Sequence, residues 1–253
     1  MSEKKDVIKS WEDKSIEWDT WIGDEGDNNR IQNSDPILWE MLGDVNGKII
    51  LDAGCGNGYL SVKMAKAGAK VTGVDVSENM ILYANEKARK EKEKKDLELK
   101  FLCDSCSTLE NQQDDFFDIV VSNYVLMDVS DVGKTIKSFY RVIKKGGVCI
   151  NVFSHPCFGS PNLPERLEDD SVKFTWTSSY FDSLKFKQEW GPFKSEFISF
   201  HRPLSFYFKI FKDAGFNVND FREPVVDKDS NTDPELIKRY RMTPYSVAFK
   251  LEK

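Results

Sequence analysis

The sequence predicts an α/β fold in which a mostly parallel sheet carries helices on both faces. Short apolar runs alternate with helical patterns along the 253 residues, and such alternation is typical of parallel strands joined by helices. One apolar run, residues 49–51, leads into a glycine-rich turn at residues 54–58, and the next ends at an acid, Asp75. A strand, a glycine-rich turn and a helix in succession predict a site for a nucleotide-like ligand, because such turns bring backbone N–H groups close to it.

The chain before this first strand is expected to be largely helical. Apolar residues recur there near one helical face: Ile8, Trp11, Trp18 and either Trp21 or Ile22. This stripe fits a helix that packs on the core, and equally a lid whose aromatic side chains cover a pocket. Residues 23–33 are polar and predict a loop. A second helix is expected to follow, with Asp35 as its N-cap, Pro36 in its first turn and Gly43 at its end.

The glycine-rich turn has the spacing Gly-x-Gly-x-Gly, with Asp52 two residues before the first glycine. A dinucleotide fingerprint has the spacing Gly-x-Gly-x-x-Gly, so the turn alone leaves the ligand open. The next helix begins after Gly58 and ends at Gly68, and residues 70–74 predict the second strand. Asp75 follows that strand, where a carboxylate can accept hydrogen bonds from both hydroxyls of a ribose.

The alternation continues beyond Ser77, which is expected to cap the third helix. Alternating apolar residues predict a third strand over residues 97–103, and an apolar run predicts a fourth over residues 116–121. Helical spacing returns at residues 132–143, and residues 148–153 predict the fifth strand.

Regular alternation breaks down between residue 158 and about residue 200, where prolines and aromatic residues are frequent. This stretch predicts an insertion after the fifth strand, with short strands of its own. The regular pattern then resumes with a helix that ends at Gly215. Residues 216–221 and 245–251 predict two closing strands.

Composition narrows the functional class. The net charge of −6 disfavours a nucleic-acid partner, which usually needs a basic face. No apolar run approaches the roughly 18 residues of a membrane span, and the first residues lack the apolar core of a signal peptide. A cytoplasmic location is the expectation.

The cysteines predict reduced thiols. There are five, Cys55, Cys103, Cys106, Cys149 and Cys157, and an odd number without an export signal argues against a disulfide framework. Cys103 and Cys106 form a C-x-x-C pair, but no second pair follows at the spacing of a zinc site. Burial at a strand end is favoured over metal or redox use, and no metal is expected.

Taken in order, these motifs resemble those of the class I S-adenosylmethionine-dependent methyltransferases, of a small-molecule type similar to methyltransferase domains 11 and 25. Residues 51–58 resemble the family's cofactor loop, and residues 74–77 its acidic strand end. Asp104 resembles the acid after the third strand. Residues 117–120 resemble the fourth-strand motif, and residues 141–147 the end of the helix before the fifth strand.

The resemblance implies a Rossmann-like, doubly wound sheet of seven strands in the order 3-2-1-4-5-7-6, with the last strand antiparallel. It implies a helical lid over residues 1–47 and a cofactor-binding core over residues 48–157. A substrate-side insertion would then cover residues 158–200, and residues 201–253 would complete the same domain.

The resemblance further implies that the cofactor is S-adenosyl-L-methionine, with S-adenosyl-L-homocysteine as its product. The backbone of the loop would lie beneath the methionine half of the cofactor, through Gly54, Cys55, Gly56, Asn57 and Gly58. Asp52 would orient that loop, and Asn123 would lie near the methionine moiety. Arg30 would pair with the cofactor carboxylate, or else be a solvated surface charge.

At the other half of the cofactor, the resemblance assigns Asp75 to the ribose hydroxyls. Val76 and Met80 would flank the apolar face of the adenine. Asp104 and Ser105 would recognise its amino edge.

Methyl transfer of this kind is an in-line attack on a sulfonium methyl group, so positioning supplies much of the rate. A general base is needed only if the acceptor arrives protonated. His155, just after the fifth strand, and His201, after the insertion, are the candidates for a base or an acceptor clamp, although both also fit structural turns. Trp18, Trp21 and Tyr124, together with His155, would line an apolar or aromatic acceptor pocket, but core packing explains the aromatic residues equally well.

The favoured function is methyl transfer to an O, N, S or C atom of a small molecule, by a monomer or a homodimer. One alternative is a protein that binds S-adenosylmethionine without catalysis. Another is an NAD-dependent oxidoreductase, since an acid after the second strand also suits NAD. A tRNA or protein methyltransferase is less favoured because the net charge of the chain is negative.

Overall fold

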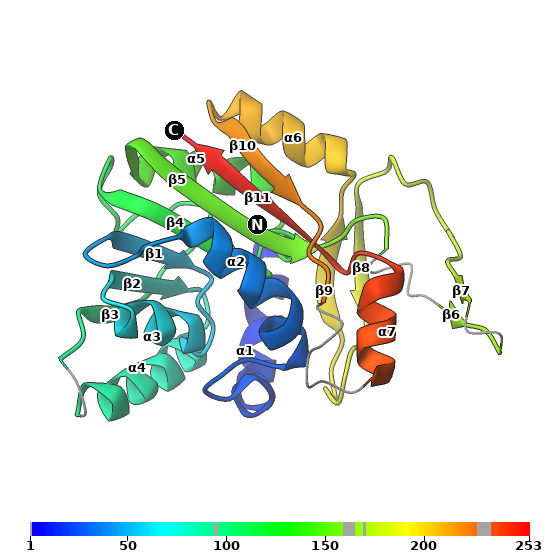
Figure 1. Cartoon of the computed structure of the whole chain (residues 1–253), viewed down its shortest axis with the longest axis horizontal. Coiled ribbons are helices and arrows are strands. Elements are labelled where there is room, and N and C mark those ends of the chain that lie inside the picture. The colour runs from blue at the N-terminus through cyan, green and yellow to red at the C-terminus, as the bar shows by residue number, and fades with distance from the viewer. Residues whose placement is uncertain (1, 94–95, 159–164, 169–170, 227–233) are drawn as a thin grey trace.

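A seven-stranded sheet lies at the centre of the protein (Figure 1). The computed structural model describes residues 2–93, 96–158, 165–168, 171–226 and 234–253. In spatial order the strands are β10 (Asn217–Arg222), β11 (Ser246–Glu252), β5 (Ile143–Ser154), β4 (Phe117–Asn123), β1 (Ile49–Ala53), β2 (Lys70–Asp75) and β3 (Leu99–Cys103).

Neighbouring strands are parallel except at β11, which runs antiparallel to both β5 and β10. Counted along the chain, the order is third, second, first, fourth, fifth, seventh and sixth. The predicted fold class is therefore confirmed. Because the parallel strands end at the same edge of the sheet, the loops that follow β1, β2, β3, β4 and β5 meet there.

Helices cover both faces of the sheet. On one side lie α2 (Asp35–Leu42), α3 (Tyr59–Lys66) and α4 (Glu78–Lys92), and on the other α5 (Val132–Val142) and α6 (Leu204–Asp213). Successive residues of β1 serve the two sides in turn. Ile50 belongs to the buried cluster that includes residues of α2 and α3, whereas Leu51 belongs to the cluster that includes residues of α5 and α6. This is the alternation expected of a strand buried on both faces.

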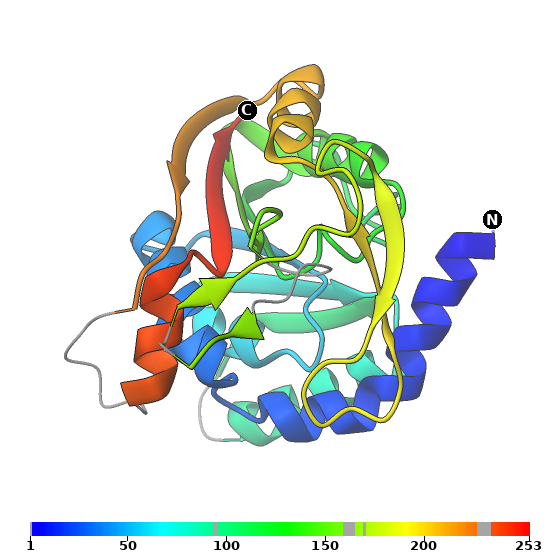
Figure 2. The same cartoon turned by 90° about the vertical axis from the view of Figure 1, so that its right-hand side faces the viewer.

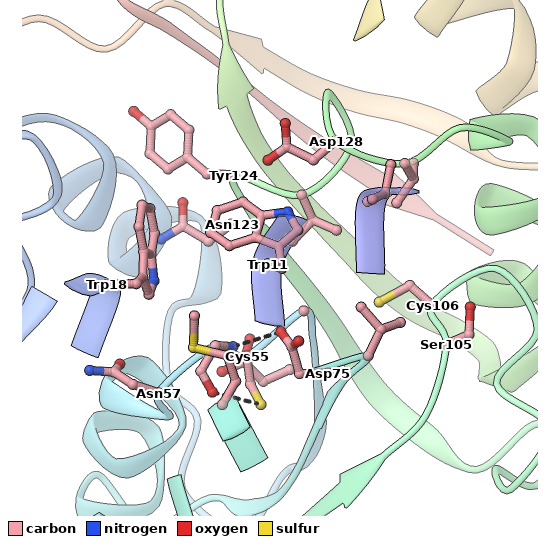
Figure 3. Close-up of a pocket in the computed structure, with 18 of the residues that line it drawn as sticks. Trp11, Trp18, Cys55, Asn57, Asp75, Ser105, Cys106, Asn123, Tyr124 and Asp128 are labelled. Carbon is pink, nitrogen blue, oxygen red and sulfur yellow. Dashed lines mark hydrogen bonds between the residues drawn. The ribbon is translucent and has the colours of Figure 1, made fainter. Parts of the chain in front are cut away.

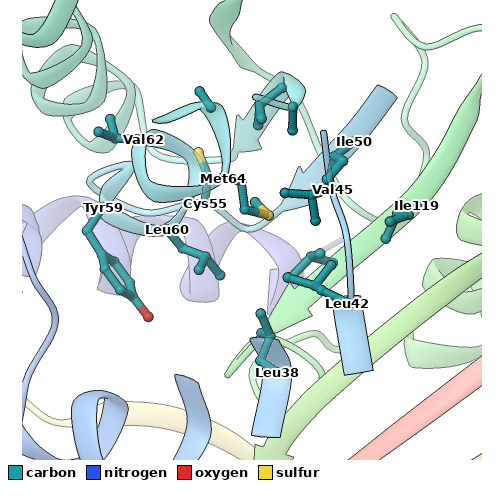
Figure 4. Close-up of a cluster of buried hydrophobic side chains, with 14 of the residues drawn as sticks. Leu38, Leu42, Val45, Ile50, Cys55, Tyr59, Leu60, Val62, Met64 and Ile119 are labelled. Carbon is teal, nitrogen blue, oxygen red and sulfur yellow. The ribbon is translucent and has the colours of Figure 1, made fainter. Parts of the chain in front are cut away.

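The first of these clusters anchors the strand that leads into the glycine-rich turn (Figure 4). Leu38 and Leu42 of α2, Leu60 and Met64 of α3, and Ile50 of β1 belong to the same cluster. Each of these side chains is buried, and burying one apolar side chain of this size contributes about 1.5–3 kcal/mol. The turn therefore begins from a rigid base.

A separate group of elements lies beyond the carboxyl ends of the parallel strands. It includes α1 (Ser2–Ile22) and a hairpin of β8 (Leu184–Gln188) and β9 (Phe197–His201), which lie side by side (Figures 1 and 2). The contact is aromatic: the rings of Trp11 and Trp18 meet that of Phe197 at centroid distances of 5.6 and 6.2 Å. β6 (Glu165–Arg166), β7 (Val172–Lys173) and α7 (Pro234–Met242) complete the described elements.

The loop predicted over residues 23–33 is partly wrong. The chain turns helical at Asn28 and forms a π-helix over Arg30–Ser34 that continues into α2. Asp27 caps this segment, since its carboxylate accepts the backbone N–H of Arg30 at 2.9 Å. Asp35 therefore lies inside a longer helical run instead of capping it. The polar composition was misleading because Asn29 and Asn33 are buried, where they bond to each other.

Two further elements differ from the prediction. The fifth strand begins earlier than the predicted residue 148, since β5 starts at Ile143, directly after α5 ends at Val142. The helix α7 has no counterpart in the sequence prediction. The expected insertion contains β6, β7, β8 and most of β9, while its residues 159–164 and 169–170 lie outside the described part of the chain.

Candidate functional site

The glycine-rich turn is held tightly against β2. The backbone N–H groups of Gly54 and Cys55 both donate to the carbonyl of Val74, at 2.8 and 3.0 Å. Gly54, Gly56 and Gly58 have φ angles of +81°, +53° and +79°, a region that favours glycine. The spacing Gly-x-Gly-x-Gly thus provides the three left-handed positions of this turn.

Gly58 also leaves no room for a side chain. A Cβ atom there would lie 2.7 Å from Cζ of Phe101 and 2.9 Å from Cβ of Ala84. We expect Gly58→Ala to lower the free energy of unfolding by roughly 2–4 kcal/mol, because left-handed strain and overpacking add. Urea unfolding followed by circular dichroism measures this effect. Gly47→Ala is the matched control, since Gly47 also has a positive φ of +73° but nothing within 4 Å of its Cβ position. Equal losses in the two variants would contradict the role given to packing.

Asp75 joins the turn to the start of α4 (Figure 3). One carboxylate oxygen accepts the N–H of Gly56 and the other that of Ser77, each at 3.0 Å. Burial raises the pKa of Asp75, and these backbone donors oppose the effect. A carboxylate has about four acceptor positions, so Asp75 retains capacity for two further donors.

The helix α1 closes over this region by binding the N-terminus of α4. The Glu12 carboxylate accepts hydrogen bonds from the Ser77 hydroxyl and, at 3.2 Å, from the Asn79 N–H. Ser77 in turn accepts the N–H of Met80 at 3.1 Å as the predicted cap. A carboxylate at a helix N-terminus is favoured by the helix dipole. A second link joins Asn57 Nδ2 to Asp19 at 2.8 Å.

These elements enclose a first cavity at the carboxyl edge of the sheet (Figure 3). Many predicted cofactor residues line it: Arg30, Asp52, Gly54, Cys55, Gly56, Asn57, Asp75, Val76, Met80, Ser105 and Asn123. Trp11 and Trp18 of α1 also line it, as do Cys106 and Ser107 after β3. The structure thus brings together residues from six separate parts of the chain.

Two predicted cofactor residues do not line this cavity. Gly58 lies behind the turn, against Phe101. The Asp104 carboxylate accepts the backbone N–H groups of Ser105 and Asn111, at 2.7 and 3.2 Å, and so braces the loop after β3.

Asp52 lies beneath the turn, where the Ser61 hydroxyl donates to its carboxylate at 2.6 Å. Burial raises the pKa of Asp52 to about 7, although the Ser61 hydrogen bond opposes this. The Asn123 amide donates to the Tyr59 hydroxyl at 3.1 Å. Its buried Oδ1 finds no partner within the described residues, and a buried acceptor without a donor indicates a site for a ligand or water.

Arg30 is not a solvated surface charge. Its guanidinium is buried, forms an ion pair with Asp27 at 3.1 Å, and lies over the rings of Trp18 and Tyr124 at 5.0 and 5.1 Å.

A second cavity lies beside the first, between α1 and the β8–β9 hairpin. Its lining is largely aromatic, with Phe158, Phe186, Trp190, Phe197, Phe200, Tyr207 and Tyr245. Both cavities are lined by Trp11, Trp18, Arg30, Tyr124 and Asp128. A ligand in one cavity would therefore lie next to a ligand in the other, along these five residues.

Asp128 is the residue at this boundary that sequence reasoning missed. It is only 8% exposed, and the Ser199 hydroxyl donates to its Oδ1 at 2.7 Å. Burial raises the pKa of Asp128 to about 7, while Ser199, Arg202 and Lys14 favour the ionised form. An acid inside the apolar stretch after β4 was the available signal, but its partner Ser199 is distant in sequence.

Arg202 fixes the loop that carries Asp128. Its guanidinium donates to the carbonyls of Leu126, Val129 and Ser130, at 3.2, 2.7 and 3.0 Å. Planar guanidinium groups suit such multidentate contacts. The loop and the Asp128 carboxylate are therefore held in one arrangement.

Of the two histidines and Trp21, which the sequence predicts at the acceptor site, one lines a cavity and two do not. His155 lines neither cavity: its Nε2 meets Glu223 at 2.8 Å, and its Nδ1 accepts the N–H of Cys157. Burial lowers the pKa of His155, against the effect of Glu223. His201 lines the second cavity. Trp21 lines neither, and its indole N–H donates to Asp27 at 3.1 Å.

The five cysteines are all free thiols. The predicted burial holds for Cys106, whereas Cys103 at the strand end is exposed. Among the described residues, no group of histidine, cysteine or acidic side chains is arranged to hold a metal ion. None of the described helices is long and apolar enough to cross a membrane.

Comparisons with known proteins agree with this geometry. A family described as "Methyltransferase domain" matches residues 44–195. A ubiquinone biosynthesis O-methyltransferase of Coxiella burnetii is 39% identical over 103 residues, which are 41% of this chain and 42% of that protein. The chain thus spans about two fifths of the length of the curated relatives it matches.

Two solved structures share the fold. An S-adenosylmethionine dependent methyltransferase from Mesorhizobium loti superposes with a TM-score of 0.73 at 23% identity, covering 86% of this chain and 96% of that one. The magnesium protoporphyrin IX methyltransferase of Synechocystis PCC 6803, with bound SAM, gives a TM-score of 0.63 at 19% identity, covering 100% and 98%.

Proposed function

Because this chain belongs to the methyltransferase domain family, we propose that it transfers a methyl group from S-adenosylmethionine to a small molecule. The observation that carries the proposal is the pair of adjacent cavities with a shared lining of five residues. The first would hold the cofactor and the second the acceptor, so that the transferred group passes between them next to Asp128.

The residues of the first cavity fit this cofactor. Asp75 has acceptor capacity for the two ribose hydroxyls, and Val76 and Met80 offer apolar surface to the adenine. The unpaired Oδ1 of Asn123 suits the ammonium group of the methionine moiety, and Arg30 suits its carboxylate. With its side chain absent, Gly56 lets the cofactor approach the backbone closely.

S-adenosylmethionine supplies a methyl group whose carbon–sulfur bond breaks as the acceptor atom attacks, the electron pair passing to sulfur. The residues of this chain provide position, exclude water and accept the proton of an O–H or N–H acceptor. Asp128 would accept this proton, because it borders both cavities and its pKa of about 7 suits a base at neutral pH. We assign no such role to His155, which lines neither cavity.

The second cavity favours a small acceptor over a macromolecule. It is bounded by α1, the β8–β9 hairpin and residues that follow α7, including Thr243 and Tyr245. The net charge of −6 does not favour tRNA. A cytoplasmic location, supported by the five free thiols, forms part of the proposal.

Isothermal titration with S-adenosylhomocysteine tests the cofactor part, and we expect one binding site per chain. Incubation with methyl-labelled S-adenosylmethionine and a protein-free metabolite extract tests the transfer, and label should appear in a small molecule. Absence of cofactor binding, or tighter binding of NAD, would overturn the proposal. Binding without any labelled product would favour a non-catalytic protein, and label in purified tRNA or protein would overturn the acceptor class.

A further inference from the structure

The β8–β9 hairpin presents one face to the second cavity. Its strands pair antiparallel, with Phe186 opposite Ser199 and Gln188 opposite Phe197. Residues directly opposite one another in such a pair point to the same face. These four residues line the cavity, as does His201 at the end of β9. The polar members of this face are Gln188, Ser199 and His201.

The hairpin is in fixed register with Asp128. The backbone N–H of Phe200 donates to the carbonyl of Met127 at 2.7 Å, next to the bond from Ser199 to Asp128. Ser199 lies between the other two polar residues on this face, and each is roughly 7 Å away by strand geometry. A flat ligand with one group at Asp128 therefore extends toward Gln188 or His201.

Both outer residues present a hydrogen-bond acceptor that has no donor. The His201 Nε2 lies 2.8 Å from the carbonyl of Tyr180, which only accepts, so Nε2 carries a hydrogen, and in the neutral ring Nδ1 is then an acceptor. That Nδ1, and Oε1 of Gln188, are buried and find no partner within the described residues. His201 itself is only 3% exposed. An unpaired buried acceptor is costly, so a ligand donor at either position is strongly favoured.

The apolar walls specify the shape of the ligand. Trp11 and Trp18 of α1 contact Phe197 of β9 at ring-centroid distances of 5.6 and 6.2 Å, so these three rings form one continuous wall of the cavity. Tyr207 of α6 and Tyr245, which follows α7, also line it. Aromatic surfaces on several sides suit a planar body that can stack or meet their edges. The cavity therefore combines flat apolar walls with hydrogen-bond acceptors along one side.

We propose that the methyl acceptor is a planar aromatic compound with at least two O–H or N–H groups, one bound by Asp128 and a second by Gln188 or His201. This inference rests on the proposed function and names the substrate class of the same site. The hairpin residues act in recognition, and they do not take part in the transfer itself.

Calorimetric titrations of the protein saturated with S-adenosylhomocysteine test the inference with three naphthalenes. 2,3-Dihydroxynaphthalene offers two donors, 2-naphthol one and 2-methoxynaphthalene none. We expect the dihydroxy compound to bind at least about tenfold more tightly than 2-naphthol, because it satisfies one more buried acceptor. The methoxy compound should bind most weakly.

Two variants locate the second contact. Gln188→Met and His201→Phe each remove an acceptor while keeping the bulk, and in at least one of them the preference for the second hydroxyl should fall below about threefold. Affinity for 2-methoxynaphthalene should stay the same. Lys187→Met is the control, since Lys187 lies between the two lining residues of β8 and is exposed. Within the described part of the chain, its side chain forms a surface ion pair with Glu196 and lines neither cavity.

The possible outcomes distinguish failure of the proposed substrate class from failure of the proposed function. Equal binding of all three naphthalenes, binding of none of them beside S-adenosylhomocysteine, or a preference that survives in both variants would overturn the inference alone. Failure of S-adenosylhomocysteine to bind would overturn the proposed function, and the inference with it.

Discussion

Replacing Asp128 with asparagine should lower kcat for an O–H or N–H acceptor about 1,000-fold, while the affinity for S-adenosylhomocysteine stays within about twofold. Asparagine keeps the size of the side chain and can still accept the Ser199 hydroxyl, but it cannot take up a proton at neutral pH. The measurement is the initial rate of labelled methyl transfer at saturating substrates. A variant that retains a third or more of wild-type kcat would exclude Asp128 as the base.

The pH profile gives an independent check on Asp128. Only its ionised form accepts a proton, so wild-type kcat/KM should rise about tenfold per pH unit up to about pH 7 and then level off. The groups around it are Ser199 of β9, Arg202 beyond β9, Lys14 of α1 and Tyr207 of α6. Lys14 is 1% exposed and burial lowers its pKa. The residual kcat/KM of the Asp128→Asn variant should not show this rise with pH below pH 7.

Stability provides a control against misfolding of this variant. The folded pKa of Asp128 lies above the unfolded value of about 3.9, so its ionisation increasingly opposes folding as the pH rises from about 4 to about 7. Asp128→Asn should therefore melt at a higher temperature than the wild type at pH 8, and the difference should vanish near pH 4. Asp213→Asn, at an exposed ion pair on α6, should change neither activity nor this profile.

Replacing Asp75 with alanine should weaken binding of S-adenosylhomocysteine at least about 100-fold, because two hydrogen bonds to a charged acceptor each contribute roughly 1.5–3 kcal/mol. Isothermal titration measures the loss. The wild-type carboxylate also accepts the N–H groups of Gly56 and Ser77, so part of the effect would come from a less ordered turn.

A second substitution separates these contributions. Asp75→Asn keeps one acceptor oxygen and should bind S-adenosylhomocysteine with an affinity between those of wild type and Asp75→Ala. Asp213→Ala is the control for loss of an acidic side chain away from the cavity. An affinity within threefold of wild type for Asp75→Ala would refute the assigned cofactor site.

The fold was predictable because its signals are local. The apolar run at residues 49–51, the three glycines and the acid at the end of β2 are each set by backbone geometry and by burial on both faces. The same holds for Ser77, whose capping role follows from its position before α4. Strand order then came from the resemblance to a known family.

The acceptor side was less predictable because its contacts join distant segments. Asp128 gains its properties from Ser199 and Arg202, more than 70 residues away. The misassigned loop at residues 23–33 shows the same limit, since Asn29 bonds to Tyr124 across 95 residues. Patterns along the sequence give no indication of such pairings. Polar residues that are buried in the fold therefore have the same composition as a loop when only the sequence is considered.

The contact of Glu12 with the start of α4 has a consequence for how the two ligands affect each other's binding. The same helix contributes Trp11 and Trp18 to both cavities. If α1 moves to admit either ligand, the two binding equilibria are thermodynamically linked, and each ligand changes the affinity of the other by the same factor. Occupancy of the first cavity would then hold the Glu12 contact closed and complete the wall against which the second ligand binds, so S-adenosylhomocysteine should raise the affinity for the second ligand, and the second ligand should raise that for S-adenosylhomocysteine by the same factor.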